Sequence, residues 1–185
     1  MPNFTFTQGF VQNPPDLCTA CLMNAICTMP QPTKVVAITS FGLVHTSYAA
    51  LPLVYKPLYA YVIHAPHMDK MGMERLAAYL TGREWSADDP EPTEKIMGPG
   101  EWTQREGLPE KGGLKDIVLV RPSLLTDGAC YAETAASKEK KPYRVSDGEI
   151  SCAYTISRRD VAHFIVEDLV PGWEQYRGKC ISLAY

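Results

Sequence analysis

The chain has 185 residues and a formal net charge of −3, and 45% of its residues are hydrophobic. A chain of this length is expected to fold as one domain that buries roughly 70% of its unfolded surface. Its acidic balance argues against a nucleic-acid or anionic-membrane surface. No apolar run approaches the roughly 20 residues that cross a bilayer. Because the N-terminus shows no signal-peptide pattern either, the sequence predicts a cytoplasmic protein.

The N-terminal part alternates apolar runs with a helical stretch, which is typical of a parallel sheet with crossover helices. Residues 4–8 (FTFTQ) and 34–40 (KVVAITS) are predicted to be strands. Between them, residues 14–29 are predicted to form a helix. Asn13 would be its N-cap and Pro14 its first residue.

The predicted helix carries three of the six cysteines. Cys18 and Cys21 have the spacing of half a redox or metal site. No second ligand pair follows at zinc-ligand spacing, so no metal site is predicted. Cys21 falls on the apolar face of the helix, where a cysteine serves as a small core residue. Buried reduced thiols are therefore the favoured interpretation, and a redox or metal role is the alternative.

The later elements are clearer. Residues 67–80 are predicted to form an amphipathic helix and residues 116–122 (DIVLVRP) a buried strand. Short strands are expected at YRVSD and SCAYTIS. A helix over 158–169 should begin with a capping box formed by Ser157 and Asp160. The sequence KCISLAY is expected to close the chain as a final strand.

Residues 82–113 differ from the rest, because they are rich in glycine, proline and charge and show no periodicity. We expect a surface insertion within a single domain spanning residues 1–185. Trp85 and Trp102 should anchor it, either on the domain or on a partner. A segment of this length without regular structure is expected to be functional or mobile.

Four segments follow one another along the chain: AITSFG, HMDKMGMERL, IVLVRPSLLTDG and TISRRDVAHFIVEDL. Together they resemble the second half of an atypical short-chain dehydrogenase of the NmrA-like and biliverdin/flavin-reductase-like type. The resemblance covers nearly the whole chain outside 82–113. It implies a Rossmann-like α/β fold, with helices on both faces of a mostly parallel sheet, that binds NADP(H).

The resemblance also implies roles for individual residues. Ser40, which follows Thr39 at the end of its strand, matches a hydroxyl that hydrogen-bonds a substrate carbonyl or the nicotinamide. Lys70 stands where the family's lysine binds the nicotinamide ribose. A surface ion pair between Lys70 and Glu74, four residues further on, is the alternative interpretation.

Some of the other positions match the family's residues and some do not. The family's tyrosine, four residues before the lysine, falls on Pro66, which has no proton to donate. His67 is adjacent and is a candidate proton donor, although a histidine at a helix start is often simply exposed. Pro122, Ser123 and Leu124 match the turn that presents backbone groups to the nicotinamide amide.

The family's glycine-rich turn, which cradles the cofactor pyrophosphate at a helix N-terminus, has no counterpart in this sequence. Neither GPG (98–100) nor KGG (111–113) follows a strand or opens an apolar helix. Gly9 resembles a glycine that lets the cofactor pass close to the backbone. By resemblance, the chain begins near the fourth strand and lacks roughly three βα units. We therefore expect weak or absent NADP binding.

In the doubly wound order the first strand lies beside the fourth. Without it, residues 4–8 become a sheet edge, which predicts a homodimer through that edge. Two functions then stay open. One is a reductase-like protein acting on a small-molecule substrate. The other is a non-catalytic, degenerate dehydrogenase that serves as a self-associating scaffold.

Overall fold

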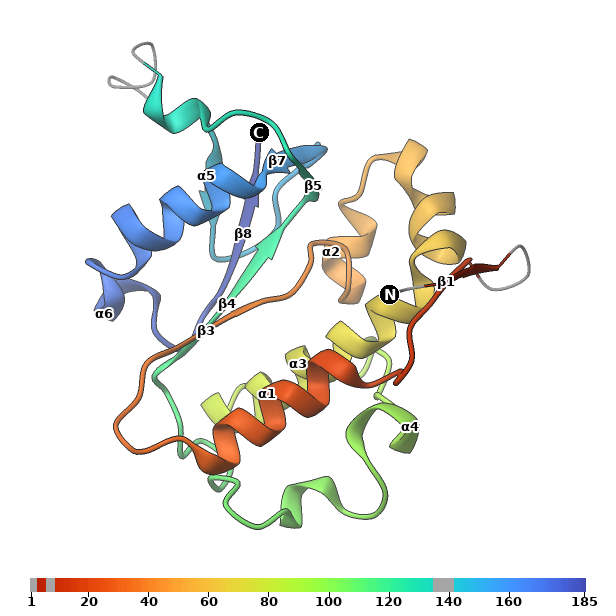
Figure 1. The fold of residues 1–185 in the computed structure, drawn as a ribbon, viewed down its shortest axis with the longest axis vertical. Helices are drawn as coiled ribbons and strands as arrows, with labels where there is room; N and C mark the ends of the chain where they lie inside the picture. The colour runs from red at the N-terminus through yellow and green to blue at the C-terminus, as the bar shows by residue number, and fades with distance from the viewer. Residues whose placement is uncertain (1–2, 6–8, 135–141) are drawn as a thin grey trace.

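The computed structural model describes residues 3–5, 9–134 and 142–185, and shows an α/β fold built on a small four-stranded sheet (Figure 1). The strands lie in the order β3 (Val35–Ile38), β4 (Ile117–Pro122), β8 (Cys180–Ala184) and β6 (Arg144–Ser146). The first three run parallel, and β6 runs antiparallel to β8. The prediction of an α/β fold with a mostly parallel sheet is therefore confirmed.

Helices cover both faces of this sheet (Figure 1). One face carries α1 (Leu17–Thr28) and α3 (His64–Thr81). The other carries α5 (Arg158–His163), the π-helix η6 (Phe164–Leu169) that continues it, and α6 (Trp173–Tyr176). All six residues of β4 are buried, as expected for a strand covered on both faces.

Short elements fill the connections. Between β3 and α3 lie α2 (His45–Ala49), the 3₁₀ helix η1 (Leu53–Tyr55) and the π-helix η2 (Leu58–Val62). After α3 come α4 (Glu94–Met97) and the 3₁₀ helix η3 (Trp102–Gln104). A separate parallel pair joins β5 (Leu124–Thr126) to β7 (Thr155–Ser157), and the 3₁₀ helix η4 (Tyr131–Glu133) follows β5. Among the described residues, no helix is both long enough and apolar enough to span a membrane.

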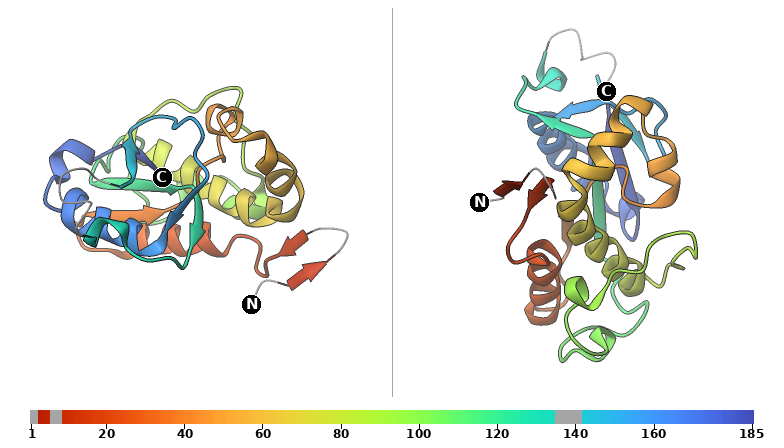
Figure 2. Two further views of the ribbon diagram at one scale, coloured as in Figure 1. Left: turned by 90° about the horizontal axis from the view of Figure 1, so that it is seen from above. Right: turned by 90° about the vertical axis from the view of Figure 1, so that its right-hand side faces the viewer.

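The N-terminal strand is not part of the main sheet. β1 (Asn3–Thr5) pairs antiparallel with β2 (Gly9–Val11) in a hairpin that stands apart from it (Figure 2). The prediction that residues 4–8 form an edge of the main sheet is therefore wrong, and residues 6–8 lie outside the described part. Phe4 packs edge-on against Phe10, with ring centroids 5.4 Å apart. Local pairing closes only a short loop, so it loses less chain entropy than docking on the sheet.

Helix α1 begins three residues later than predicted, at Leu17 rather than residue 14. The buried Asp69 carboxylate, on α3, accepts hydrogen bonds from the backbone N–H groups of Cys18 and Thr19, both at 2.8 Å. The first N–H groups of a helix have no partner within the helix, and a carboxylate there also meets the positive end of the helix dipole. The start of α1 is thus set by a residue far away in the sequence, and the N-cap assigned to Asn13 is wrong.

The prediction of buried thiols is wrong for the three cysteines at the first helix, whereas Cys130 and Cys180 are buried. Cys21 is exposed and Cys18 and Cys27 are half-buried, because the buried face of α1 instead comprises Thr19, Leu22, Met23 and Ile26. All six cysteines are free thiols. The described residues contain no cluster of three or more His, Cys, Asp or Glu side chains that is suited to a metal ion.

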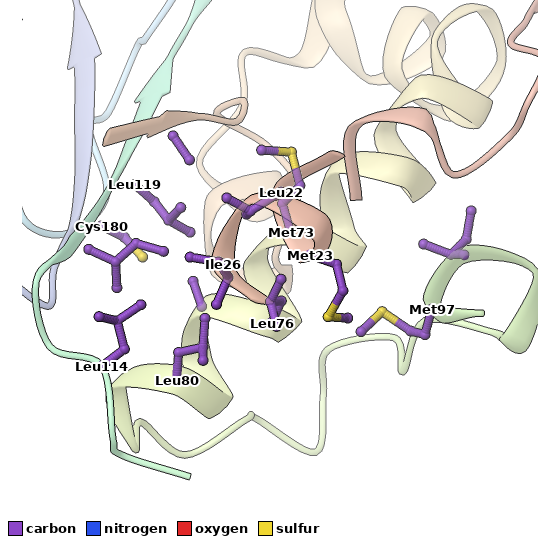
Figure 3. Close-up of a cluster of buried hydrophobic side chains, with 14 residues drawn as sticks. Leu22, Met23, Ile26, Met73, Leu76, Leu80, Met97, Leu114, Leu119 and Cys180 are labelled. Carbon is purple, nitrogen blue, oxygen red and sulfur yellow. The ribbon is translucent and has the colours of Figure 1, made fainter. Parts of the chain in front are cut away.

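The segment 82–113 contributes to the hydrophobic core. Ile96 and Met97 of α4 are buried in a cluster with side chains of α1 and α3, among them Met23 and Leu76 (Figure 3). The segment therefore covers the outer side of these two helices.

The two tryptophans of this segment are anchored on α3. The Arg75 guanidinium lies 5.6 Å from the Trp85 ring and 5.5 Å from the Trp102 ring. Trp102 also packs edge-on against Tyr79, at 5.2 Å between ring centroids. The rings were predicted to be anchored either on the domain or on a partner, and both are anchored on the domain.

Helix α5 begins at the predicted cap. The Ser157 hydroxyl oxygen accepts the Asp160 N–H at 2.9 Å. The reciprocal bond of a capping box is replaced, because the Ser157 N–H donates to the Tyr185 hydroxyl at 3.0 Å. That hydroxyl in turn donates to Asp160. The C-terminal residue is thereby tied to the start of α5.

We expect Asp69→Ala to lower the free energy of unfolding by about 2–3 kcal/mol, because it leaves buried N–H donors at the start of α1 without an acceptor. Asp127→Ala is the matched control, since Asp127 is 91% exposed and pairs with an exposed arginine. It should change stability by less than about 0.5 kcal/mol. Urea unfolding followed by circular dichroism measures both, and equal losses would contradict this account of α1.

Candidate functional site

The candidate site lies at the carboxyl end of β3, where Thr39 and Ser40 meet the first turns of α3. In open α/β sheets, ligands bind outside the carboxyl ends of the strands. Three of the residues predicted for the site come together here: Ser40, His67 and Lys70.

Ser40 and His67 are in direct contact. The half-buried Ser40 Oγ lies 3.4 Å from His67 Nε2 and donates to the Phe41 carbonyl at 3.2 Å. His67 is only 9% exposed, in contrast to the exposed helix-start histidine considered above. Burial, reinforced by the positive charge of Lys70, lowers the pKa of His67 to about 4. The imidazole is therefore neutral near pH 7, and can take part in hydrogen bonds without carrying an extra proton.

Lys70 points toward the same strand end. Its Nζ donates to the Thr39 carbonyl oxygen at 2.8 Å. Burial lowers the pKa of Lys70, and the nearby Cys18 and Asp69 oppose this shift. The alternative of a surface ion pair with Glu74 is wrong, since Glu74 is fully buried and binds another cation.

That cation is Arg121 on β4. Its Nε and Nη2 donate to the two Glu74 carboxylate oxygens at 2.9 and 2.6 Å, and the Thr39 hydroxyl donates to the same carboxylate at 2.7 Å. Burial by itself would raise the pKa of Glu74, but Arg121 and these hydrogen bonds hold it below its ordinary value. The network joins α3, β4 and the end of β3, and so fixes the backbone next to Ser40.

The pair of Glu74 and Arg121 was not predicted from the sequence, in which Glu74 stood only as a possible partner for Lys70. The available signal was an arginine within an otherwise apolar strand, IVLVRP. A buried charge requires a partner of opposite charge, which the sequence pattern does not locate.

The turn after β4 adjoins the site. The Pro122 carbonyl accepts the Phe41 N–H at 2.9 Å, which places this turn beside Ser40. Ser123 is 2% exposed, and its Oγ has no hydrogen-bond partner among the described residues. Leu124, which opens β5, is 37% exposed. A buried hydroxyl without a partner suits a ligand's polar group or an ordered water.

Gly9, which was predicted to lie next to the cofactor, packs against η2. An added Cβ atom would come within 2.6 Å of the carbonyl oxygens of Tyr61 and Val62. Its φ of +68° also favours glycine. The nearest neighbours of Gly9 are thus in η2 rather than at Thr39 or Ser40, and its absent side chain lets the hairpin approach η2.

Tyr59 is a site residue that sequence reasoning missed. It is 4% exposed, and its ring packs edge-on against His67 at 4.8 Å between centroids. Burial raises the pKa of Tyr59 to about 12, while its interaction with the Ser40 hydroxyl acts in the opposite direction. Gly42 makes room for the ring, since a Cβ there would lie 2.7 Å from Tyr59 Cε1. No fixed spacing connects Tyr59 to Ser40, so this contact could not be predicted from the sequence.

An apolar cavity of about 350 Å³ lies along α3. His64 and Met68 of α3 line it together with Met71 and Ile96, whereas Ser40, His67 and Lys70 are not among its lining residues. Its volume lies at the lower end of the range for small-molecule sites, and its lining is largely apolar.

The chain is similar to a reductase from Aspergillus terreus, "Reductase pytE", with 34% identity over 138 residues. The match covers 73% of this chain and 42% of the relative, so the chain spans less than half of that protein. No protein-family model matches the chain. No solved structure matches it significantly.

Two variants test the site's electrostatics. We expect Glu74→Gln to lower the free energy of unfolding by about 3–5 kcal/mol, because it leaves the Arg121 charge buried without a counter-charge. Glu91→Gln is the control, since Glu91 pairs with Arg75 at 2.7 Å but has a side chain that is 56% exposed. This control should lose less than about 1 kcal/mol in urea unfolding. A loss of similar size in both variants would refute the role given to the buried pair.

His67 predicts a pH dependence of stability. Its folded pKa of about 4 lies below the unfolded value near 6.5, so the unfolded chain binds the proton more readily between these pH values. The free energy of unfolding should therefore fall as the pH is lowered through this window, by up to about 3 kcal/mol. His67→Gln should remove this part of the pH dependence and His45→Gln, at an exposed residue, should keep it. Urea titrations at several pH values measure the difference.

Proposed function

We propose that the chain is an NAD(P)-linked, short-chain-dehydrogenase-like protein with reduced cofactor affinity. The observation that carries the proposal is the convergence of Ser40 and Lys70 at the carboxyl end of β3, with the Lys70 amino group 2.8 Å from the Thr39 carbonyl. The similarity to a reductase supports the same class of chemistry.

The residues present fit the nicotinamide end of such a cofactor. NADPH, when bound, would supply the hydride for reducing a carbonyl group. The Ser40 hydroxyl can donate a hydrogen bond to a substrate carbonyl or to the nicotinamide amide. The Lys70 ammonium can bind ribose hydroxyls, since it offers three donors of which the Thr39 carbonyl takes one. The Ser123 hydroxyl, which lacks a partner among the described residues, is available to a carboxamide.

Two features support reduced function. The sequence contains no glycine-rich turn that would hold a pyrophosphate at a helix N-terminus. The ordinary acid of the family is also replaced, because Pro66 occupies its position. The nearby His67 is neutral, with a pKa of about 4, and Tyr59 holds its proton tightly, with a pKa of about 12. The substrate we propose is a small carbonyl compound.

A second candidate is a non-catalytic, self-associating scaffold that retains the fold of a dehydrogenase. The observation that favours it is the outer edge of β3, on which no strand of the described part pairs. Under this candidate, NADPH binding and carbonyl reduction would both be absent while self-association persists.

We expect the isolated chain to bind NADPH with a Kd above about 100 μM, corresponding to a binding free energy weaker than about −5.5 kcal/mol. Lys70→Met should weaken this binding at least about fivefold, because it removes the charged donor at the ribose position. Lys115→Met is the control, since Lys115 is exposed and precedes β4 at the opposite end of the sheet.

Isothermal titration calorimetry at high protein concentration measures these affinities. A low-micromolar Kd would refute the reduced affinity. Equal effects of the two lysine variants would refute the assignment of Lys70. Undetectable binding at millimolar NADPH would favour the scaffold.

A further inference from the structure

The outer edge of β3 lacks the features that usually protect a sheet edge. Its four residues, VVAI, are all apolar and include no charge, proline or bulge. Edges of this kind offer free backbone groups to another strand. The opposite edge, β6, is different: Arg144 is exposed and donates to the carbonyl oxygens of Ser151 and Cys152, and Asp147 beside the strand pairs with Lys179.

The pairing with β4 determines which groups of β3 point outward. The N–H groups of Val35 and Thr39 donate to β4 or the residue before it, at 2.8 Å in each case. Alternate residues of a strand point their backbone groups in opposite directions within the sheet. The N–H and C=O groups of Val36 and Ile38 therefore face away from β4. No strand among residues 3–5, 9–134 and 142–185 pairs with them.

The side chains of the strand repeat this alternation. Ala37 packs in the cluster with α1 and α3, and Val36 packs against the cluster on the α5 face. Ile38 shares the face of Val36 but is 42% exposed, which is unusual for an isoleucine within a sheet. The structure thus leaves both a backbone edge and an adjoining aliphatic side chain uncovered.

We propose that two copies of this chain pair antiparallel through the outer edges of β3, about a two-fold axis at Ala37. In this register Val36 of one copy lies opposite Ile38 of the other. Residues that face each other in this way exchange both of their N–H···O bonds. The two sheets then form one continuous sheet.

The same register suits the side chains. Ile38 of each copy lies beside Val36 of the other, on the face covered by α5 and η6, so the exposed isoleucine gains an aliphatic neighbour. On the opposite face, Ala37 meets Ala37 of the second copy. Its small side chain leaves space where the α1 layers of the two copies approach each other.

A second copy is the occupant we infer because the edge is complementary to itself. A two-fold axis requires each patch to match its own image, with residue i contacting residue j and j contacting i. The Val36 and Ile38 positions meet this condition with both backbone and side-chain groups. An unrelated strand would need a matching sequence that nothing in the molecule specifies.

The experiment is light scattering coupled to size-exclusion chromatography, from about 1 to 200 μM of the full chain. We expect the mass to rise from 20.5 kDa toward twice that value as concentration increases. Ile38→Lys should shift the transition at least tenfold to higher concentration, because it places two ammonium groups at the apolar junction. Val145→Lys is the control, since Val145 is 36% exposed on β6 and should leave the transition unchanged.

A second variant separates backbone pairing from side-chain effects. Ile38→Pro removes an outward N–H, which an edge strand tolerates, and should also shift the transition at least tenfold. Far-UV circular dichroism and the unfolding midpoint confirm that each variant remains folded. A wild type that is monomeric at 200 μM overturns the proposal, as does a dimer that Ile38→Lys and Ile38→Pro leave intact or that Val145→Lys disrupts equally.

This result is independent of NADPH binding. A monomer that binds NADPH would refute the dimer and keep the proposed reductase function. A dimer without NADPH affinity would keep the pairing through β3 and refute the proposed reductase function.

Discussion

The buried ion pair between Glu74 and Arg121 is the interaction on which the site depends. It connects α3 to the central strand β4, and through the Thr39 hydroxyl it also holds the end of β3. Each charge is buried and is compensated chiefly by the other. Removal of either one would therefore leave the remaining charge unpaired in a low-dielectric interior. Because Ser40 follows Thr39 directly and Lys70 lies one helical turn before Glu74, the functional side chains inherit their positions from this pair.

Two apolar layers cover the two faces of the sheet, and different parts of the chain complete each layer. The layer of α1 and α3 includes α4, which comes from a stretch that looks irregular in sequence. The layer of α5, η6 and α6 is completed by the end of the chain, where Tyr185 hydrogen-bonds both Ser157 and Asp160. In both layers, a segment that is distant in sequence from the neighbouring helices completes the cover over the sheet.

The sequence was sufficient where the structure depends on local pattern. Continuous apolar runs located β3, β4 and β8, and helical periodicity with a serine cap located α3 and α5. It failed where a contact with another part of the chain decides the outcome. Asp69 sets the start of α1, and Phe4 belongs to the β1–β2 hairpin instead of to the main sheet. At the site, resemblance led to Ser40, His67 and Lys70, but Tyr59 and the Glu74–Arg121 pair are defined only by contacts in three dimensions.

The adjacency of Asp69 and Lys70 limits how the site can move. Asp69 is bound to the first N–H groups of α1, while the next residue along α3 is bound to the Thr39 carbonyl. A rotation or sliding of α3 that carried Lys70 toward a ligand would pull Asp69 away from α1 and leave buried donors without an acceptor. The α3 backbone at Lys70 is therefore held in place, and a ligand must approach the lysine where this backbone presents it. Any adaptation to different ligands has to come from the far end of the Lys70 side chain or from the chain between β3 and α3.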